Sequence, residues 1–153
     1  MHIRPIERGD KDRWLPLWRG YQAFYKVQIP DAVTDLTWSR FFDDGVPMHA
    51  LVAEDGPGLL GLVHYVFHAS TWTEGPYVYL QDLFTAESAR GRGVGRALIE
   101  AVYDAAKTAK AARVYWLTHE TNTTAMALYD KVADKSGFIQ YHKTFQAGAR
   151  SRA

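Results

Sequence analysis

The sequence predicts an α/β protein built on a mixed, mostly antiparallel and twisted sheet of about six to seven strands, accompanied by about four helices. Three observations predict this architecture. The length of 153 residues suits one domain. A composition with 47% hydrophobic and 23% charged residues suits a buried core. The apolar residues switch several times between strand-like and helix-like spacing, which is typical of hairpins and strand–helix–strand connections within one sheet.

The first third of the chain predicts one strand and two helices. Residues 3–5 form the expected short strand. Aromatic and leucine side chains then recur at steps of three and four from residue 14 to residue 25, which indicates one face of a helix. Asp10 is the expected N-cap of this helix, because its carboxylate can accept hydrogen bonds from the free N–H groups of the first turn. Thr34 is expected to cap a second, shorter helix.

The remaining elements alternate between strands and helices. Two apolar, β-branched runs joined by an Asp-Gly-Pro-Gly turn predict a hairpin. A glycine-rich turn followed by helix-forming residues predicts a strand-to-helix connection. The expected strands cover residues 48–54, 59–70, 77–85, 113–118 and 138–145, and the expected helices cover residues 94–107 and 124–135.

The composition excludes several classes of function. A net charge of +1 argues against a protein that binds nucleic acid through bulk charge. Cysteine is absent, which excludes disulfides, thiolate zinc sites and thiol nucleophiles. No apolar run approaches the roughly 20 residues of a membrane span, and the N-terminus lacks the apolar core of a secretion signal. We therefore expect a cytoplasmic protein with neither a nucleic-acid nor a membrane partner.

Two histidines of the second hairpin strand raise the question of a metal site. His64 and His68 are four residues apart, and the rise of a strand separates such residues by about 13 Å. That distance is too long for both side chains to bind one zinc ion. We expect no metal in this protein.

The glycine-rich turn carries the strongest chemical signal in the chain. It reads Arg90-Gly91-Arg92-Gly93-Val94-Gly95-Arg96. Glycines allow backbone N–H groups to converge on one point, and the helix that follows adds the positive end of its dipole. The interleaved arginines add formal charge, so the turn predicts a pyrophosphate-binding loop. It matches neither the dinucleotide fingerprint, which needs a glycine at Arg96, nor the Gly-Lys-Ser/Thr of the P-loop.

The turn resembles the R/Q-x-x-G-x-G/A pyrophosphate loop of the GNAT superfamily of N-acetyltransferases. Its flanks match as well, with a preceding strand that ends Asp82-Leu83-Phe84-Thr85 and an amphipathic helix after it. Residues 79–84 and 115–122 look most like the branch that holds the yeast histone/polyamine acetyltransferase and the spermidine/spermine acetyltransferases. The resemblance covers about residues 1–145, which implies one N-acetyltransferase domain there and a disordered tail over 146–153. It also implies a sheet that opens like a V between its fourth and fifth strands.

The resemblance implies how acetyl-CoA, the acetyl donor, binds. Backbone groups of the strand before the loop pair with the pantetheine arm and can polarise the thioester carbonyl, while backbone groups of the loop hold the pyrophosphate. Tyr129 matches the tyrosine that protonates the departing CoA thiolate. The expected cofactor-binding positions are Leu83, Phe84, Thr85, Arg90, Gly91, Arg92, Gly93, Val94, Gly95, Arg96, Asn122 and Ala125.

The implied reaction is direct transfer of the acetyl group to a primary amine, on a small cationic molecule such as a polyamine or on a lysine side chain. Four aspartates and one arginine within residues 28–47 favour a cationic acceptor. Gln81 and Asp82 are the candidate acceptor-binding residues. Gln81 stands where the polyamine branch has a glutamate, and an amide cannot accept a proton. The base therefore stays open among Asp82, His119, Glu120 and ordered water.

Two further expectations follow from departures in this sequence. The amide of Gln81 leaves a second function open, a non-catalytic acyl-CoA sensor or interaction module on the same fold. The distance from Tyr129 to Gly137-Phe138 is also four residues longer than the family's usual Tyr-x-x-x-Gly-Phe. The last strand of this branch often lies at a subunit contact, so the resemblance implies a homodimer.

Overall fold

The computed structural model, which describes residues 1–146 and 150–151, contains a five-stranded sheet in the order β1-β3-β4-β5-β6. All neighbouring strands are antiparallel except β5 and β6, which run parallel. The strands are β1 (His2–Pro5), β3 (Met48–Asp55), β4 (Gly58–His68), β5 (Tyr77–Thr85) and β6 (Arg113–Tyr115).

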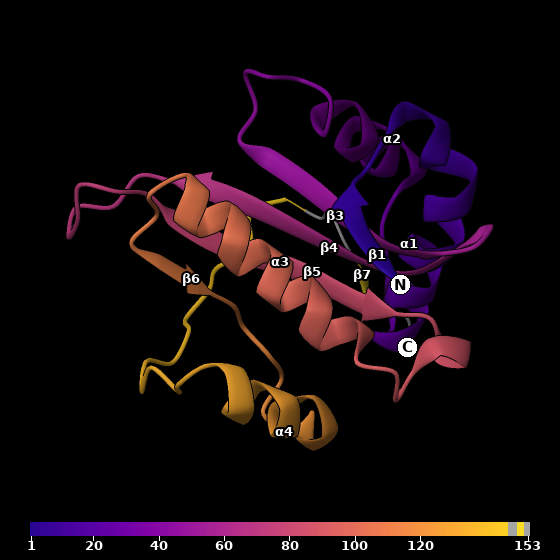
Figure 1. Ribbon diagram of the computed structural model, residues 1–153. Coiled ribbons are helices and arrows are strands. Elements are labelled where there is room, and N and C mark those ends of the chain that lie inside the picture. The colour runs from indigo at the N-terminus through magenta and orange to yellow at the C-terminus, as the bar shows by residue number, and fades with distance from the viewer. Residues whose placement is uncertain (147–149, 152–153) are drawn as a thin grey trace.

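Helices cover both faces of this sheet (Figure 1). Helix α3 packs on one face, and α1 and α2 lie on the other. Each face of the sheet has its own hydrophobic core, and successive side chains of β4 point into different ones. Val63 packs with α3, while Leu62 packs with α1. The helices are α1 (Lys11–Phe24), α2 (Asp31–Arg40), α3 (Val94–Thr108) and α4 (Thr123–Val132), with single 3-10 turns at η1 (Arg8–Asp10) and η2 (Glu87–Ala89).

The sheet opens between β5 and β6, as predicted. The two strands pair only from Tyr77 opposite Arg113 to Tyr79 opposite Tyr115. Beyond Tyr79, β5 continues to Thr85 alongside β4 alone, while residues 116–122 depart toward α4. The last two thirds of β5, residues 80–85, therefore have one unpaired backbone edge, and this edge faces the opening of the V.

A β-bulge in β5 lies at the point where the V opens. Tyr65 of β4 stands opposite Leu80 and His64 stands opposite Asp82, so Gln81 is an extra residue in β5. The bulge places Leu80 in the core under α3 and Asp82 against His64 on the α1 face. In a regular strand these two side chains, two residues apart, would share one face.

The C-terminal part departs from the prediction. The strand expected over 138–145 does not form, so the main sheet has five strands rather than the six to seven expected. Because β6 ends at Tyr115 instead of residue 118, it offers an edge of only three residues to a strand that would follow it in the sheet. A two-stranded sheet that the sequence did not predict joins β2 (Val27–Gln28) to β7 (Arg150–Ser151). The residues of β7 belong to the tail expected over 146–153, of which 147–149 and 152–153 lie outside the described residues.

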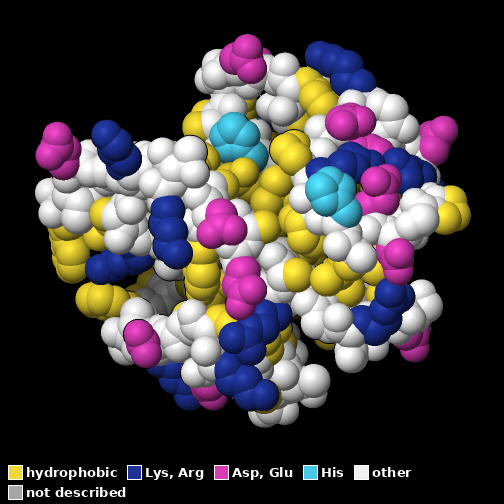
Figure 2. Space-filling view, viewed as in Figure 1, with side chains coloured by type: hydrophobic (Ala, Val, Ile, Leu, Met, Phe, Trp, Pro, Cys, Tyr) yellow, Lys and Arg dark blue, Asp and Glu magenta, His cyan; other side chains and the backbone are white. Residues whose placement is uncertain are grey.

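Helix boundaries also shift by a few residues. Helix α2 begins at Asp31 after Pro30, so Thr34 is a buried residue of its first turns rather than its cap. A proline suits the position before a helix because its φ is already fixed near the helical value. On the face shown in Figure 2, acidic and basic side chains are interspersed. None of the helices over the described ranges is long and apolar enough to span a bilayer.

Asp10 occupies the predicted N-cap of α1, but its carboxylate binds other partners. It accepts hydrogen bonds from the backbone N–H of Glu7 at 2.8 Å, from Arg4 Nη1 at 2.7 Å and from Arg13 Nη2 at 2.6 Å. Arg4 also donates to Glu54 of β3 at 2.8 Å. Asp10 is 2% exposed, and the Arg4 guanidinium holds the pKa of its carboxyl well below the usual range. This cluster ties β1, α1 and β3 together.

Asp10→Asn is expected to lower the free energy of unfolding by about 3 kcal/mol at pH 7, because it removes the buried negative charge that Arg4 and Arg13 share and leaves Glu54 as their one carboxylate partner among the described residues. The lowered pKa of Asp10 means that the stabilisation is present above the unfolded-state pKa of about 4 and is lost as the pH falls below it. Urea unfolding at pH 7 and pH 3 measures both effects. The difference in the free energy of unfolding between wild type and Asp10→Asn should be smaller at pH 3 than at pH 7. Asp12 is exposed, so Asp12→Asn should have the wild-type free energy of unfolding at both pH values.

Candidate active site

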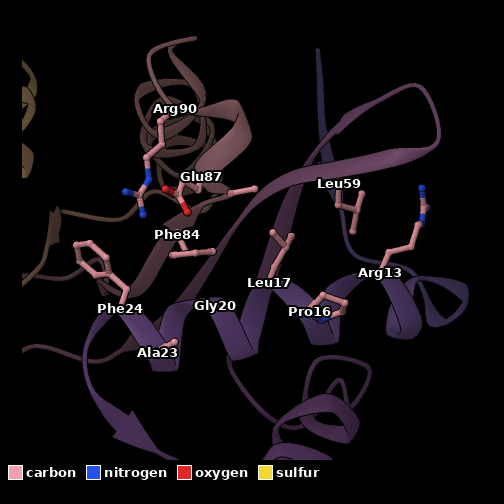
Figure 3. A pocket seen from close by; sticks show the side chains of 11 residues that line it. Arg13, Pro16, Leu17, Gly20, Ala23, Phe24, Leu59, Phe84, Glu87 and Arg90 are labelled. Atoms are coloured by element: carbon pink, nitrogen blue, oxygen red, sulfur yellow. The ribbon is translucent and has the colours of Figure 1, made fainter.

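Two cavities border the open end of β5. The gap between β5 and the residues after β6 holds about 310 Å³, and its walls come from α1, β5, residues 116–119 and α4. Tyr21, Tyr25, Gln81, Leu83, His119 and Tyr129 are among its lining residues. The second cavity, of about 620 Å³, lies between α1 and the start of β4 (Figure 3). Arg13, Leu17, Phe24, Phe84, Glu87 and Arg90 are among the residues that line it.

The glycine-rich loop presents backbone N–H groups at the start of α3. Gly91 and Gly93 have φ values of 79° and 78°, which side-chain-bearing residues rarely adopt. Gly93 is the N-cap of α3, and its carbonyl accepts the N–H of Ala97. Within the described part of the chain, the N–H groups of residues 91–96 donate to no other backbone group. They are free to bind an anion at the helix N-terminus.

The three arginines of the loop are engaged with the protein itself. Arg92 binds Asp55 at 2.7 Å, Arg96 binds Glu100 at 2.9 Å, and the Arg90 guanidinium lies 5.3 Å from the Phe24 ring centroid. Figure 3 shows Arg90 and Phe24 facing each other across one end of the larger cavity. Since the side chains of Arg92 and Arg96 are about half exposed, their ion pairs contribute little to stability. Arg92 and Arg96 can therefore leave these ion pairs and bind an anion at a small cost in free energy.

The backbone of β5 offers an edge to an extended ligand. The N–H of Ala86 donates to the carbonyl of Leu60 on β4. Because alternate residues of an antiparallel strand direct their backbone groups to opposite edges, those of Leu83 and Thr85 turn away from β4 and those of Phe84 turn toward it. The free edge therefore carries the amide and carbonyl of Leu83 and Thr85. Phe84, for which the sequence predicts an equal part, turns its backbone toward β4, and its side chain packs over Gly20 of α1.

Helix α4 brings Tyr129 to the gap. Its ring packs edge-on against Trp116 with 5.3 Å between centroids, and burial, with a smaller effect from Tyr25, raises the pKa of the phenol to about 12. Asn122 is the N-cap of α4, and its carbonyl accepts the N–H of Met126. Ala125 lies in the first turns of the same helix, half-buried.

Asp82 lies in a buried polar cluster beside the gap. Its Oδ2 is 3.0 Å from Nδ1 of His64, and the residue is 9% exposed. Burial, followed by the negative charge of Asp82, raises the pKa of the phenols of Tyr21, Tyr25 and Tyr79, of which Tyr21 also hydrogen-bonds Asp82. Of the two predicted acceptor-binding residues, Gln81 is exposed and lines the gap, whereas Asp82 lies behind the lining residue Tyr21.

The other candidate bases lie differently. His119 lines the gap but is exposed, and its Nδ1 binds Thr121 at 2.7 Å. Glu120 is exposed and is not among the residues that line the gap. Sequence reasoning missed His64, Tyr21 and Tyr25 as residues near the site. The aromatic spacing of α1 placed both tyrosines on one helix face, but nothing in the sequence showed which strand that face would meet.

The comparison with protein families identifies the chain. The model of the acetyltransferase (GNAT) family matches residues 14–133. The chain belongs to the GNAT family. It is 38% identical over 143 residues to the D-amino-acid N-acetyltransferase HPA3 of Saccharomyces cerevisiae, a match that covers 92% of this chain and 89% of that protein. It is 33% identical over 136 residues to the thialysine N-epsilon-acetyltransferase of Bos taurus, covering 83% and 79% of the two chains.

Solved structures of GNAT enzymes share the fold. A probable acetyltransferase superposes with a TM-score of 0.83 at 21% identity, over 95% of this chain and 99% of that one. The aminoglycoside N-acetyltransferase AAC(6')-Iy in complex with CoA superposes with a TM-score of 0.72 at 16% identity, over 95% and 100% of the two chains. These identities support the fold alone.

Membership of the GNAT family confirms several predictions. The protein is an acetyltransferase that uses acetyl-CoA to acetylate an amine, rather than a non-catalytic sensor. Its relatives confirm the predicted branch of the family. The free N–H groups of the loop, the open edge of β5 and the adjoining gap fit acetyl-CoA, which carries a pyrophosphate and an extended amide-containing arm. In the described residues, no group of three or more histidines and carboxylates could hold a metal ion.

Proposed function

We propose that this GNAT enzyme acetylates a primary amine on a small cationic acceptor, and that Asp82 receives the ammonium group. A polyamine and the aminoalkyl side chain of lysine or thialysine belong to this class. The observation that carries the proposal is a buried carboxylate, paired with His64, whose negative charge acts on Tyr21 and Tyr25 in the wall of the gap. The names of the relatives, which mention thialysine and D-amino acids, support a small amine as the acceptor.

The surroundings of Asp82 suit a cation. Its partner His64 accepts a hydrogen bond on Nε2 from the indole N–H of Trp14 at 3.1 Å, which leaves the other nitrogen to donate to Asp82. A histidine with one proton is neutral, so the pair carries one negative charge.

Different residues of the protein bind acetyl-CoA, accept a proton from the acceptor and protonate the leaving thiolate. Bound acetyl-CoA supplies an acetyl thioester. The N–H groups of Gly91 to Arg96 hold its pyrophosphate, and the free edge of Leu83 and Thr85 aligns its extended arm, with Asn122 and Ala125 on the opposite side. Asp82 takes a proton from the acceptor ammonium, and the free amine then forms a C–N bond to the acetyl carbonyl carbon while the C–S bond to CoA breaks. The second proton that the nitrogen gives up replaces the one that Tyr129 loses to the thiolate. Tyr129 holds a proton on its phenol at neutral pH, because its pKa is about 12, and can release it to the thiolate that leaves.

Transfer assays test the proposed acceptor class. Thialysine, lysine, spermidine, putrescine and D-alanine, an amino acid whose side group carries no charge, are incubated with acetyl-CoA, and release of the CoA thiol is followed. We expect turnover with the acceptors that carry an aminoalkyl cation, at a kcat/KM at least about 10-fold above that of D-alanine. Equal or better turnover of D-alanine would contradict the proposal.

Gly93→Ala tests the loop. A Cβ at this position meets no atom within 4 Å, so the strain comes only from φ of +78°. That strain is about 1–2 kcal/mol and favours a relaxed loop. We expect the dissociation constant for CoA, measured by calorimetry, to rise about 10-fold. Gly9→Ala, where a Cβ also meets nothing and φ is not positive, should bind CoA as wild type does.

We further propose that the enzyme is a homodimer in which a second copy covers residues 138–145. Four large apolar side chains of this segment are 74–90% exposed in the single protomer: Phe138, Ile139, Tyr141 and Phe145. Such a concentration of exposed apolar surface is characteristic of an interface. The resemblance to the branch in which the last strand lies at a subunit contact also favours this partner.

Light scattering coupled to gel filtration tests the dimer. We expect the wild type to elute with twice the mass of one protomer and the double variant Ile139→Ser/Tyr141→Ser to elute with the mass of one protomer. Trp72 is 70% exposed on a different segment, so Trp72→Ser serves as the control and should remain dimeric. A wild type that is monomeric at about 50 µM would contradict the proposal.

A further inference from the structure

A buried histidine lies directly behind the proposed acceptor site. The side chain of His64 is 3% exposed. Its ring packs against Trp18 and Phe41 with centroid distances of 4.9 Å in both cases. Both ring nitrogens have partners, Trp14 at Nε2 and Asp82 at Nδ1. Nothing in the transfer reaction described above requires this residue.

The two partners fix the protonation of the ring. The indole nitrogen of Trp14 can only donate a hydrogen bond, so Nε2 of His64 must present its lone pair. The remaining proton then lies on Nδ1, which donates to Oδ2 of Asp82 at 3.0 Å. A proton on Nε2 would bring two N–H groups against each other in a buried place, where an unpaired donor is costly.

We propose that His64 is a positioning residue, which Trp14 locks in its neutral Nδ1–H form so that it orients the Asp82 carboxylate toward the acceptor and leaves its negative charge undiminished. The inference rests on the proposed role of Asp82. Within the described residues, Asp82 is the charged group that contacts His64, and the phenol of Tyr21 approaches Asp82 from α1. The packing side chains of Trp18 and Phe41 carry no charge.

The locked tautomer has a direct consequence for the acceptor. A doubly protonated His64 would form a neutral pair with Asp82, and the site would lose its attraction for an ammonium group. The neutral ring instead satisfies one carboxylate oxygen by a hydrogen bond and leaves the net charge of the pair at one negative unit. Trp14 thereby acts on the electrostatics of the site through His64, without touching the acceptor.

Three variants of His64 and its partner test the proposal in transfer assays with thialysine. His64→Leu removes the donor to Asp82, and we expect kcat/KM for thialysine to fall roughly 10- to 100-fold, the size of a lost hydrogen bond to a charged group. His64→Asn places an amide N–H near the position of Nδ1, and we expect it to stay within about 3-fold of wild type. Trp14→Phe keeps the packing but releases Nε2, so the ring is no longer held in one tautomer and the KM for thialysine should rise above that of wild type.

Controls separate positioning from folding. The KM for acetyl-CoA should not change in any variant, because His64 does not line the gap. His49→Leu serves as the matched control, since His49 lies on the neighbouring strand β3 against Tyr65 and Phe67 on the other face of the sheet. Thermal melts report whether each variant folds. ¹⁵N chemical shifts of the His64 ring in the wild type should show a protonated Nδ1 and a bare Nε2.

The outcomes distinguish this inference from the proposed function. A wild type that acetylates no amine overturns the proposed acceptor class, while the ring tautomer is measured without any turnover. If transfer occurs, a folded His64→Leu with wild-type kcat/KM overturns the positioning role, as does a folded His64→Asn no better than His64→Leu. A proton on Nε2 in the wild type overturns it even if His64→Leu fails to fold.

Discussion

Replacing Tyr129 by phenylalanine is expected to lower kcat about 100-fold while the KM for acetyl-CoA stays close to that of wild type. The change removes one oxygen atom and keeps the ring that packs on Trp116. A thiol is a fair leaving group even without a proton donor, so the loss should be at the low end for general acid catalysis. Steady-state kinetics with thialysine at saturating acetyl-CoA measures it.

The pH profile of the wild type adds an independent measure of the same role. Burial raises the pKa of Tyr129 to about 12, so the phenol keeps its proton across the working range. Ionisation of Tyr129 should therefore cause no decline of kcat up to about pH 10. Tyr103→Phe is the matched control, because its hydroxyl donates to the carbonyl of Val132 at the end of α4 without facing the gap. If Tyr129→Phe and Tyr103→Phe had the same kcat, the proposal that Tyr129 donates a proton in the reaction would be wrong.

The sequence predicted most of the fold because its signals were local. The apolar spacing of α3, the Asp-Gly-Pro-Gly hairpin and the glycines of the loop each depend on a few neighbouring residues, and each appeared as expected. The strand over 138–145 was predicted from the same kind of local pattern, yet it has no partner among the described residues. A strand needs a neighbouring edge of sufficient length, and the early end of β6 leaves only three residues on the edge of that strand.

The candidate site shows where local reasoning stops. The role of the loop followed from glycine and arginine spacing, but the environment of Asp82 depends on one extra residue, Gln81, in the register of β5. Regular alternation would have placed Asp82 on the face of Leu80, under α3. The bulge instead turns Asp82 toward His64, which is 18 residues away in the sequence, and toward Tyr21 of α1, which is about 60 residues away. Only pairing between distant strands reveals that arrangement.

Asp82→Asn is expected to produce the largest effect in the protein, a fall of about 1000-fold in kcat/KM for thialysine. The amide has the size of the carboxylate and can still accept the hydrogen bond from His64, so the local packing should persist. It carries no charge to attract an ammonium group and cannot take its proton. CoA affinity, measured by calorimetry, should stay the same because Asp82 lies on the α1 face and not on the free edge of β5.

The dependence of this loss on pH separates the two roles of Asp82. A primary amine of the lysine type has a pKa of about 10.4, so an increasing share of the acceptor arrives without its proton as the pH approaches 10. If Asp82 acts as the base, the kcat deficit of Asp82→Asn should shrink as the pH is raised. If it acts only by attracting the cation, the deficit should lie in the KM for thialysine, with kcat unchanged at every pH.

Glu120→Gln and His119→Gln serve as controls for the other bases that the sequence left open. A loss of about 1000-fold in either of these, with an active Asp82→Asn, would move the base away from the buried carboxylate and onto the exposed side of the gap.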